Sequence, residues 1–265
     1  MGCSKKPPPP PAAEPLKRKF LQETVTNAQE SLANRRLAVS ALATNQAGAA
    51  QLLHWVSLGV LSNDLRPVLT LELAHAPWPN IRSQAWEMLP PYLDKHQQPL
   101  PPLGKFFTLQ GNPARGATLF KHPDLNCIGC HRLNGEGVAL GSDLSDIGLR
   151  MDAATLLESL VDPSAIITPG YETWLVVDRD ENEHVGVLAR ETEQVLALRD
   201  AKNNEIVISK AQIKQRRQVP VSIMPAGLQQ SVTVQDLVDL WLFLRGCRQP
   251  SATNAPPTPP AHVSP

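Results

Sequence analysis

Apolar side chains recur every three or four positions between residues 17 and 96, a spacing that places them on one face of a helix. The clearest sets are Leu37, Ala38, Ala41 and Leu42, followed by Leu52, Leu53 and Val56. Asn63-Asp64 is suited to cap a helix from Leu65 to Ala74. Pro79-Asn80 is suited to begin another helix, which ends near Leu89. This pattern predicts an α-helical domain over residues 17–96.

Part of this helical pattern occurs twice. Three residues reappear in the same order and at the same spacing, Arg35, Ala38 and Leu42 as Arg82, Ala85 and Leu89. The distance between the copies is typical of paired-helix repeats of the HEAT type. Two copies fit such an array and an unrelated small helical bundle equally well.

The second half of the chain also begins and ends with helical patterns. Asn112-Pro113 has the composition of an N-cap followed by a first-turn proline, for a helix that carries Gly116 and Phe120. Residues 153–160 predict a short helix. Thr233 to Asp236 resembles a capping box. It would open a last helix with one apolar stripe, made by Leu237, Leu240, Trp241 and Leu244.

Between these helices the pattern alternates as in β-strands. Four short strands are predicted, at 171–177, 184–188, 194–198 and 205–208, with turn-rich segments at 178–183 and 200–204. We therefore expect a mainly α protein in which a small antiparallel β unit, at about 171–219, is inserted into a second domain at 109–247. Residues 97–108 read as a linker, and the Pro-rich ends, 1–16 and 248–265, as a disordered tether and tail.

Composition narrows the function classes. The 265 residues are 42% hydrophobic, which is enough for packed domains. Lys plus Arg equals Asp plus Glu at 25 each, so no overall charge favours nucleic acid as a partner. No apolar run reaches the roughly 18 residues that a transmembrane helix needs. Four cysteines are too few for a disulfide scaffold in a chain of this length.

Residues 127–131, Cys-Ile-Gly-Cys-His, form a C-x-x-C-H motif, which is typical of c-type haem attachment. Two thiols on one turn can form thioether bonds to the two vinyl groups of a porphyrin, and the adjacent imidazole then faces the iron. A zinc site would need a second ligand pair, which Cys3 and Cys247 do not supply. A thioredoxin-like dithiol would need a strand-to-helix junction. We therefore predict one covalent haem c, held by Cys127 and Cys130 and ligated by His131.

The sixth ligand of the iron is predicted to be Met224. This residue stands in a loop before the last helix, where Pro225 favours an extended backbone. Paired His and Met ligands raise the potential and suit electron transfer, whereas an open site suits ligand binding or catalysis. Met151 is the other nearby methionine, Met88 falls in the helical domain, and His122 is the runner-up ligand.

The N-terminus contains a further candidate site. Gly2-Cys3-Ser4 resembles the junction of a bacterial lipoprotein, with Cys3 as the lipid-bearing residue and a Pro-rich spacer behind it. No apolar segment of a secretory signal precedes it. The two open alternatives are a lipid tether at Cys3 and an exposed cysteine without a role.

From Gly111 to Gly246, about half of the chain, the sequence resembles the c-type haem-binding domain family of Planctomycetes and Verrucomicrobia. The matching segments are 115–120, 127–137, Asp143-Leu144, 156–163, Pro169-Gly170-Tyr171, 224–228 and 239–244. The resemblance implies a cytochrome c fold over 109–247, with a β insertion between the middle helix and the loop of the distal ligand. It also implies His131 and Met224 as axial ligands. One departure is Gly141-Ser142-Asp143, where the family usually has Gly-Pro-Asp, so Ser142 is expected to loosen a loop beside the haem.

These features together predict an electron carrier, not an enzyme, that works in the periplasm or elsewhere outside the cytoplasm. The resemblance also favours HEAT-like repeats upstream of the haem domain, and it implies that the redox partner is a separate protein. Two alternatives remain open, a haem enzyme or gas sensor with a labile sixth ligand and an assembly subunit of a larger redox complex. In c-type cytochromes the helix with Gly116 and Phe120 typically crosses the helix with Leu240 and Trp241, and Gly116 would allow a close approach.

Overall fold

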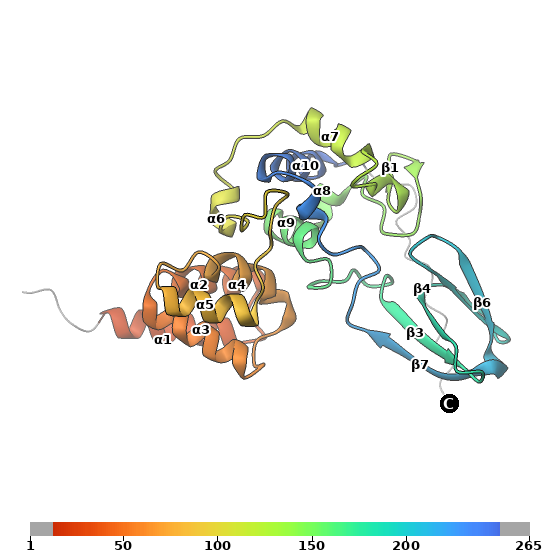
Figure 1. Ribbon diagram of the computed structural model, residues 1–265, viewed down its shortest axis with the longest axis horizontal. Helices are drawn as coiled ribbons and strands as arrows, with labels where there is room; N and C mark the ends of the chain where they lie inside the picture. The colour runs from red at the N-terminus through yellow and green to blue at the C-terminus, as the bar shows by residue number, and fades with distance from the viewer. Residues whose placement is uncertain (1–12, 250–265) are drawn as a thin grey trace, which may run out of the picture. The chain divides into compact units, whose positions relative to one another are not determined.

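The computed structural model describes residues 13–249 (Figure 1), and these residues form two compact units. The first unit holds residues 13–91 with 101–103, and the second holds residues 92–100 with 104–249. The expected lipidation site, Cys3, lies outside the described residues. Within the described residues, no helix is long and apolar enough to cross a membrane.

The first unit is helical, as the apolar spacing predicts. Its elements are α1 (Ala13–Thr26), α2 (Leu32–Ala43), α3 (Gln46–Ser57), the 3-10 turn η1 (Asn63–Leu65), α4 (Arg66–Leu73) and α5 (Pro79–Met88). Ser31 caps α2 and Asn45 caps α3, each by accepting a backbone N–H of the first turn with its side chain. Leu42, Leu52 and Leu65 are completely buried, so this unit has a hydrophobic core of its own.

Helices α2 to α5 of the first unit each pack against two of the others. Helix α2 contacts α3 and α4, and α5 contacts α3 and α4. The sequence repeat at Arg35 and Arg82 matches α2 with α5, whereas the contacts place α2 beside α4 and α3 beside α5. The packing therefore resembles stacked helix pairs but does not follow the repeat that the sequence suggested.

The chain divides earlier than expected, and the expected linker is partly ordered. Residues 92–100 belong to the second unit, where the backbone N–H of Lys95 donates to the carbonyl of Val232 at 2.9 Å. Within 97–108, α6 (Leu103–Phe106) forms and Phe106 is completely buried. The first helix also begins at Ala13, inside the segment that we expected to be disordered. Leu100, Leu103 and Phe106 are buried, and these apolar anchors explain why the expected linker is ordered.

The second unit is built around two crossing helices, α7 (Pro113–Lys121) and α10 (Val234–Gly246) (Figure 1). Asn112 caps α7, and Thr233 and Asp236 form the capping box of α10, as predicted. A Cβ atom on Gly116 would lie 2.1 Å from the carbonyl oxygen of Asp239. Only glycine permits this crossing, and the expected close approach is confirmed.

Buried polar groups fix the crossing as well. Asp239 is completely buried, and its Oδ1 accepts the backbone N–H of Asn112 at 2.7 Å. The guanidinium of Arg115 lies 3.3 Å from Oδ2 of Asp239 and donates to Asp236 at 2.7 Å. The side chains of Phe120 and Phe243 pack with ring centroids 5.9 Å apart.

The other elements of the second unit outside its large sheet are short. They are η2 (Cys127–Gly129), the hairpin of β1 (Arg132–Leu133) and β2 (Glu136–Gly137), α8 (Ile147–Arg150), α9 (Ala153–Val161) and η4 (Leu228–Ser231).

The predicted β unit is a five-stranded antiparallel sheet with the order β6-β5-β4-β3-β7. Its strands are β3 (Thr173–Asp178), β4 (Glu183–Glu191), β5 (Val195–Arg199), β6 (Glu205–Ser209) and, after the turn η3 (Lys210–Gln212), β7 (Ile213–Val219). Val176, Leu196, Leu198 and Ile208 form the buried core of the sheet. Four of these strands were predicted and β7 was missed.

Strand β7 was missed because its sequence is polar. The Ile213–Val219 segment is mostly exposed and contains Lys214, Arg216 and Arg217, so it lacks the alternation of a half-buried strand. Tertiary contacts hold it at the edge of the sheet instead. The guanidinium of Arg216 stacks on the ring of Trp174 at 5.5 Å and pairs with Glu191 at 2.9 Å. The sheet is therefore larger than the small unit that the sequence indicated.

Candidate cofactor site

The Cys-x-x-Cys-His peptide is folded into a single tight turn. Asn126 has a left-handed backbone with φ of 45° and directly precedes the 3-10 turn η2 at Cys127. The backbone N–H groups of Cys130 and His131 donate to the carbonyl of Cys127 at 3.1 and 2.9 Å. This turn brings both cysteines and the histidine to the wall of one cavity.

The imidazole of His131 is fixed on one side by a loop. Its Nδ1 lies 2.7 Å from the carbonyl oxygen of Ser142. Because a carbonyl can only accept, Nδ1 carries the proton and Nε2 keeps its lone pair for a metal. A Cβ atom on Gly141 would lie 2.5 Å from Cε1 of this ring, so the glycine backbone packs directly against it. Burial lowers the pKa of His131, while Ser142 and Asp143 act in the opposite direction; the net effect favours the neutral imidazole that a metal requires.

The cavity is large, open and mostly apolar. Its empty volume is about 1400 Å³, including the solvent at its mouth. Apolar residues from α7, α8, α9, α10 and the loops between them line it, among them Phe120, Ile147, Leu156, Leu160, Ile167 and Leu244. A hydrophobic space with two thiols and one imidazole on the same wall fits a porphyrin that is attached through that wall. The residues present therefore fit haem c.

Two methionines line the same cavity, Met224 and Met151. The backbone N–H of Met224 donates to the hydroxyl of Ser222 at 3.1 Å, and the N–H of Ser222 in turn donates to the hydroxyl of Ser164 at 3.0 Å. These bonds tie the Met224 loop to the segment that follows α9. The sulfur of Met151 lies 3.8 Å from the hydroxyl of Ser159, which donates to the carbonyl of Thr155 at 2.8 Å. Met88 instead lies on α5 of the first unit and is partly exposed.

Comparison with known proteins agrees with this geometry. The protein family described as Cytochrome c matches residues 113–181. The chain contains a c-type cytochrome domain. The matched range includes α7, the Cys-x-x-Cys-His turn, α8 and α9, and it ends inside the inserted sheet, before Met224. No curated protein matches the chain.

A c-type cytochrome domain implies covalently bound haem c. Burial raises the pKa of Cys127 to about 11, and burial also raises the pKa of Cys130. Cys127, Cys130 and Cys247 are all unpaired in the described structure. The sulfur of Cys247 faces the carbonyl of Phe243 at 3.4 Å and does not line the cavity of the cytochrome domain.

The rival interpretations of the motif find no support in the described residues. Among them, no group of three or more His, Cys, Asp or Glu side chains could hold a metal ion such as zinc. The motif follows helix α7 and a turn, not a strand, which differs from the strand-to-helix setting of a thioredoxin-like dithiol. His122 ends α7, is partly exposed and contacts Asp124 at 3.6 Å, and it does not line the haem cavity.

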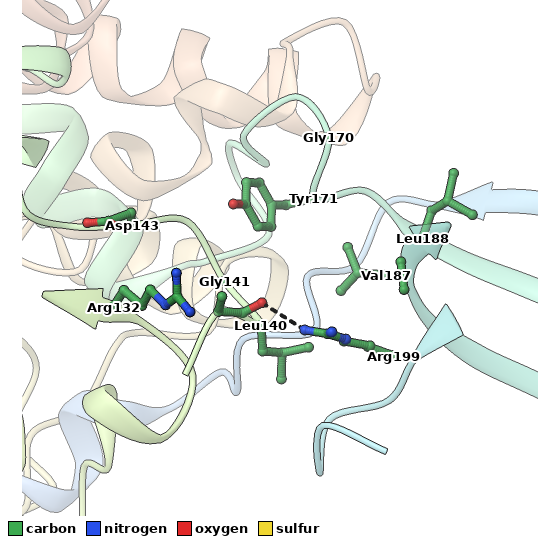
Figure 2. A pocket seen from close by; sticks show the side chains of 11 residues that line it. Arg132, Leu140, Gly141, Asp143, Gly170, Tyr171, Val187, Leu188 and Arg199 are labelled. Carbon is green, nitrogen blue, oxygen red and sulfur yellow. Dashed lines mark hydrogen bonds between the residues drawn. The ribbon is translucent and has the colours of Figure 1, made fainter. Parts of the chain in front are cut away.

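A second pocket of the cytochrome domain was not predicted from the sequence (Figure 2). It is lined by Arg132 of β1, by the loop 139–143, by Tyr171 and by Val187, Leu188 and Arg199 of the sheet. Burial raises the pKa of Tyr171, so the phenol stays protonated. Arg199 is far from the motif in sequence, and no local pattern marks it, because only the fold of the inserted sheet brings it here.

Proposed function

We propose that this chain is an electron carrier with one haem c, attached through Cys127 and Cys130 and ligated by His131 and Met224. The observation that carries the proposal is that these four side chains line a single apolar cavity. The bound iron would supply one-electron chemistry at that place. We further propose that the chain is not an enzyme.

The residues around the cavity suit electron transfer in three ways. The loop with Gly141 and Ser142 holds the His131 ring in one orientation. The Ser222 hydroxyl anchors the Met224 loop. The apolar wall limits water and so lowers the reorganisation that a change of charge requires. Two ligands that stay in place in both oxidation states fit outer-sphere exchange better than catalysis.

Met224 is the better candidate for the sixth ligand. Met224 stands in the loop before α10, where Pro225 favours an extended backbone at the preceding residue. The hydrogen bonds through Ser222 and Ser164 hold this loop at the wall of the cavity, which keeps Met224 beside the proposed iron site. The two methionines therefore form a matched pair for the experiment.

The test is the visible spectrum of the oxidised protein with its haem attached. Wild-type protein and the control Met151→Ala are expected to show low-spin iron and the weak far-red band of a methionine–ferric bond. Met224→Ala is expected to lose the band and to become high-spin or to bind added ligands. High-spin iron in the wild type would favour the alternative, a haem enzyme or gas sensor. Loss of the band in Met151→Ala alone would assign the ligand to Met151.

We also propose that the protein works outside the cytoplasm, in the periplasm, with a separate redox protein as its partner. A lipid on Cys3 would tether it to a membrane there. Fractionation of cells that express the protein tests this, because Cys3→Ala should move the protein from the membrane to the soluble extracytoplasmic fraction. Equal membrane association of both proteins would contradict the tether.

The helical unit is proposed to be a HEAT-like platform that docks the carrier onto its partner. The packing of α2 beside α4 and of α3 beside α5 supports this. Leu37 of α2 is 70% exposed, and such a large apolar side chain is available for an interface. Leu37→Glu should weaken co-purification with the redox partner without changing the haem spectrum. Unchanged co-purification would contradict the proposal.

A further inference from the structure

The second pocket lies behind the loop that supports His131 (Figure 2). The backbone N–H groups of Leu140 and Gly141 donate to the carbonyl of Cys130 at 3.0 and 2.7 Å, which holds the loop against the haem motif. One side of Gly141 contacts the His131 ring, and the loop also lines the second pocket. The loop thus separates this pocket from the haem cavity, although Leu140, Gly141 and Tyr171 line both.

The side chains of Arg132, Arg199 and Tyr171 bring hydrogen-bond donors to this pocket. Nε of Arg132 is buried and has no hydrogen-bond partner in the described structure. Nη1 of Arg199 donates to the carbonyl of Ala139 at 3.2 Å, and the described residues provide no further partner for its guanidinium. The hydroxyl of Tyr171 likewise has no hydrogen bond within the described part of the chain. Figure 2 shows the guanidinium groups of Arg132 and Arg199 extending into the pocket from opposite sides.

The charge in the pocket is not neutralised from within. Asp143 is the acidic residue of its lining, and Oδ1 of this carboxylate already accepts the backbone N–H of Ser145 at 2.9 Å and its hydroxyl at 2.6 Å. Two guanidinium groups face one carboxylate, so the pocket has an excess of positive charge. Nε of Arg132 is the buried donor of this pocket that lacks a protein partner among the described residues, and such an atom requires a water, an ion or a ligand to complete its hydrogen bonding.

We propose that this pocket binds a small organic carboxylate from solution, held by Arg132, Arg199 and the hydroxyl of Tyr171. A guanidinium offers parallel N–H groups that match the two oxygens of a carboxylate. The remaining walls are apolar, formed by Leu140, Val187 and Leu188, and they suit a short hydrocarbon chain better than a phosphate. The inserted sheet then has a role that the haem alone does not explain, because it supplies Arg199 and one apolar wall. This inference goes beyond the proposed electron transfer.

The test is calorimetric titration of the haem-loaded protein with butyrate, with the neutral butyramide and with inorganic phosphate as comparisons. Butyrate should bind saturably and raise the melting temperature, whereas butyramide should do neither. Arg199→Gln and Arg132→Gln should each weaken butyrate binding about tenfold or more, since each removes charged hydrogen bonds. Arg190→Gln is the matched control, because Arg190 of β4 pairs with Glu205 at 2.9 Å and does not line the pocket.

Three results would overturn the inference: no saturable binding of butyrate, equal binding by wild type and the Arg199→Gln variant, or tighter binding of phosphate than of butyrate. The absence of butyrate binding would also be seen if a carboxylate of the haem itself filled the pocket. Haem content is measured on the same samples by the spectrum of the pyridine adduct. Missing haem would count against the proposed function, whereas full haem content without butyrate binding counts only against the carboxylate site.

Discussion

The backbone of Gly141 packs against the imidazole of His131, so this position tests how the histidine is oriented. A Cβ atom there would lie 2.5 Å from Cε1 and 2.8 Å from Nδ1 of the ring. Gly141→Ala should push the ring from the Ser142 carbonyl and weaken that hydrogen bond. A less basic imidazole donates less to ferric iron, so the midpoint potential should rise, and stability should fall by about 1–3 kcal/mol.

Redox titration and denaturant unfolding measure these two effects. Gly246→Ala is the control, because nothing lies within 4 Å of a Cβ atom at Gly246. A potential equal to that of wild type in Gly141→Ala would show that the loop does not set the orientation of the ring.

Asp178 gives a pH-dependent prediction in the sheet. Hydrogen bonds from Asn182, then from His184, lower the pKa of Asp178 to about 2, against the small opposing effect of burial. The pKa is lower in the folded than in the unfolded state, so the carboxylate contributes to stability above about pH 4, and this contribution is lost as the pH falls through 2. Asn182→Ala should raise the pKa toward its ordinary value.

An NMR titration of the Asp178 carboxyl carbon measures this directly. The control is Asn204→Ala, which removes the equivalent contact of Asp200 in the turn between β5 and β6 and should leave Asp178 unchanged. An ordinary pKa for Asp178 in the wild type would contradict the prediction.

At the site, the sequence indicated the candidate residues that form a local motif and missed the candidates that only the fold brings together. Cys127, Cys130 and His131 are recognisable because covalent attachment requires them at fixed spacing, and the loop context singled out Met224. All four line one cavity, whereas their bonds to haem remain predictions. The partner of His131 is a backbone carbonyl, at Ser142, which any residue could supply. Such a contact leaves no trace in the sequence.

At the scale of elements, the crossing of α7 and α10 depends on the lack of a side chain at Gly116. A Cβ atom there would lie 2.1 Å from a backbone oxygen and 2.6 Å from Cβ of Phe243. Gly116→Ala should therefore separate the helices and lower the free energy of unfolding of the haem-loaded protein by about 1–3 kcal/mol or more. Denaturant unfolding followed by haem absorbance measures the change.

Gly104→Ala is the comparison for this variant. Gly104 lies in α6, and nothing lies within 4 Å of a Cβ atom there, so that substitution should be neutral or slightly stabilising. Equal stability of Gly116→Ala and Gly104→Ala would mean that the crossing relaxes without cost.

Elements with strong local signals were predicted well. Caps, first-turn prolines and apolar stripes identified α7, α9 and α10, and turn residues separated β3 to β6. Strand β7 escaped prediction because its place depends on Trp174 and Glu191, which are distant in sequence. The same limit applies to the order of the sheet, since β3 pairs with β7 across the three strands between them in the chain.

At the scale of the whole molecule, the two units have separate hydrophobic cores. A substitution in the core of the first unit should therefore change the stability of that unit without changing the midpoint potential of the haem. Leu42 is completely buried in the first unit, whereas every residue that lines the haem cavity belongs to the second. Leu42→Ala should destabilise the helical unit by about 2–5 kcal/mol through loss of packing and an unfilled cavity. The midpoint potential should stay at the wild-type value.

Phe120→Ala is the opposite case. Phe120 is also completely buried, but it lines the haem cavity. Its loss should admit water beside the cofactor and stabilise the more highly charged ferric state, so the potential should fall. Calorimetry measures the stability of both variants, and redox titration measures their midpoint potentials. A shift of potential in Leu42→Ala as large as that in Phe120→Ala would show that the helical unit tunes the haem instead of serving as a separate platform.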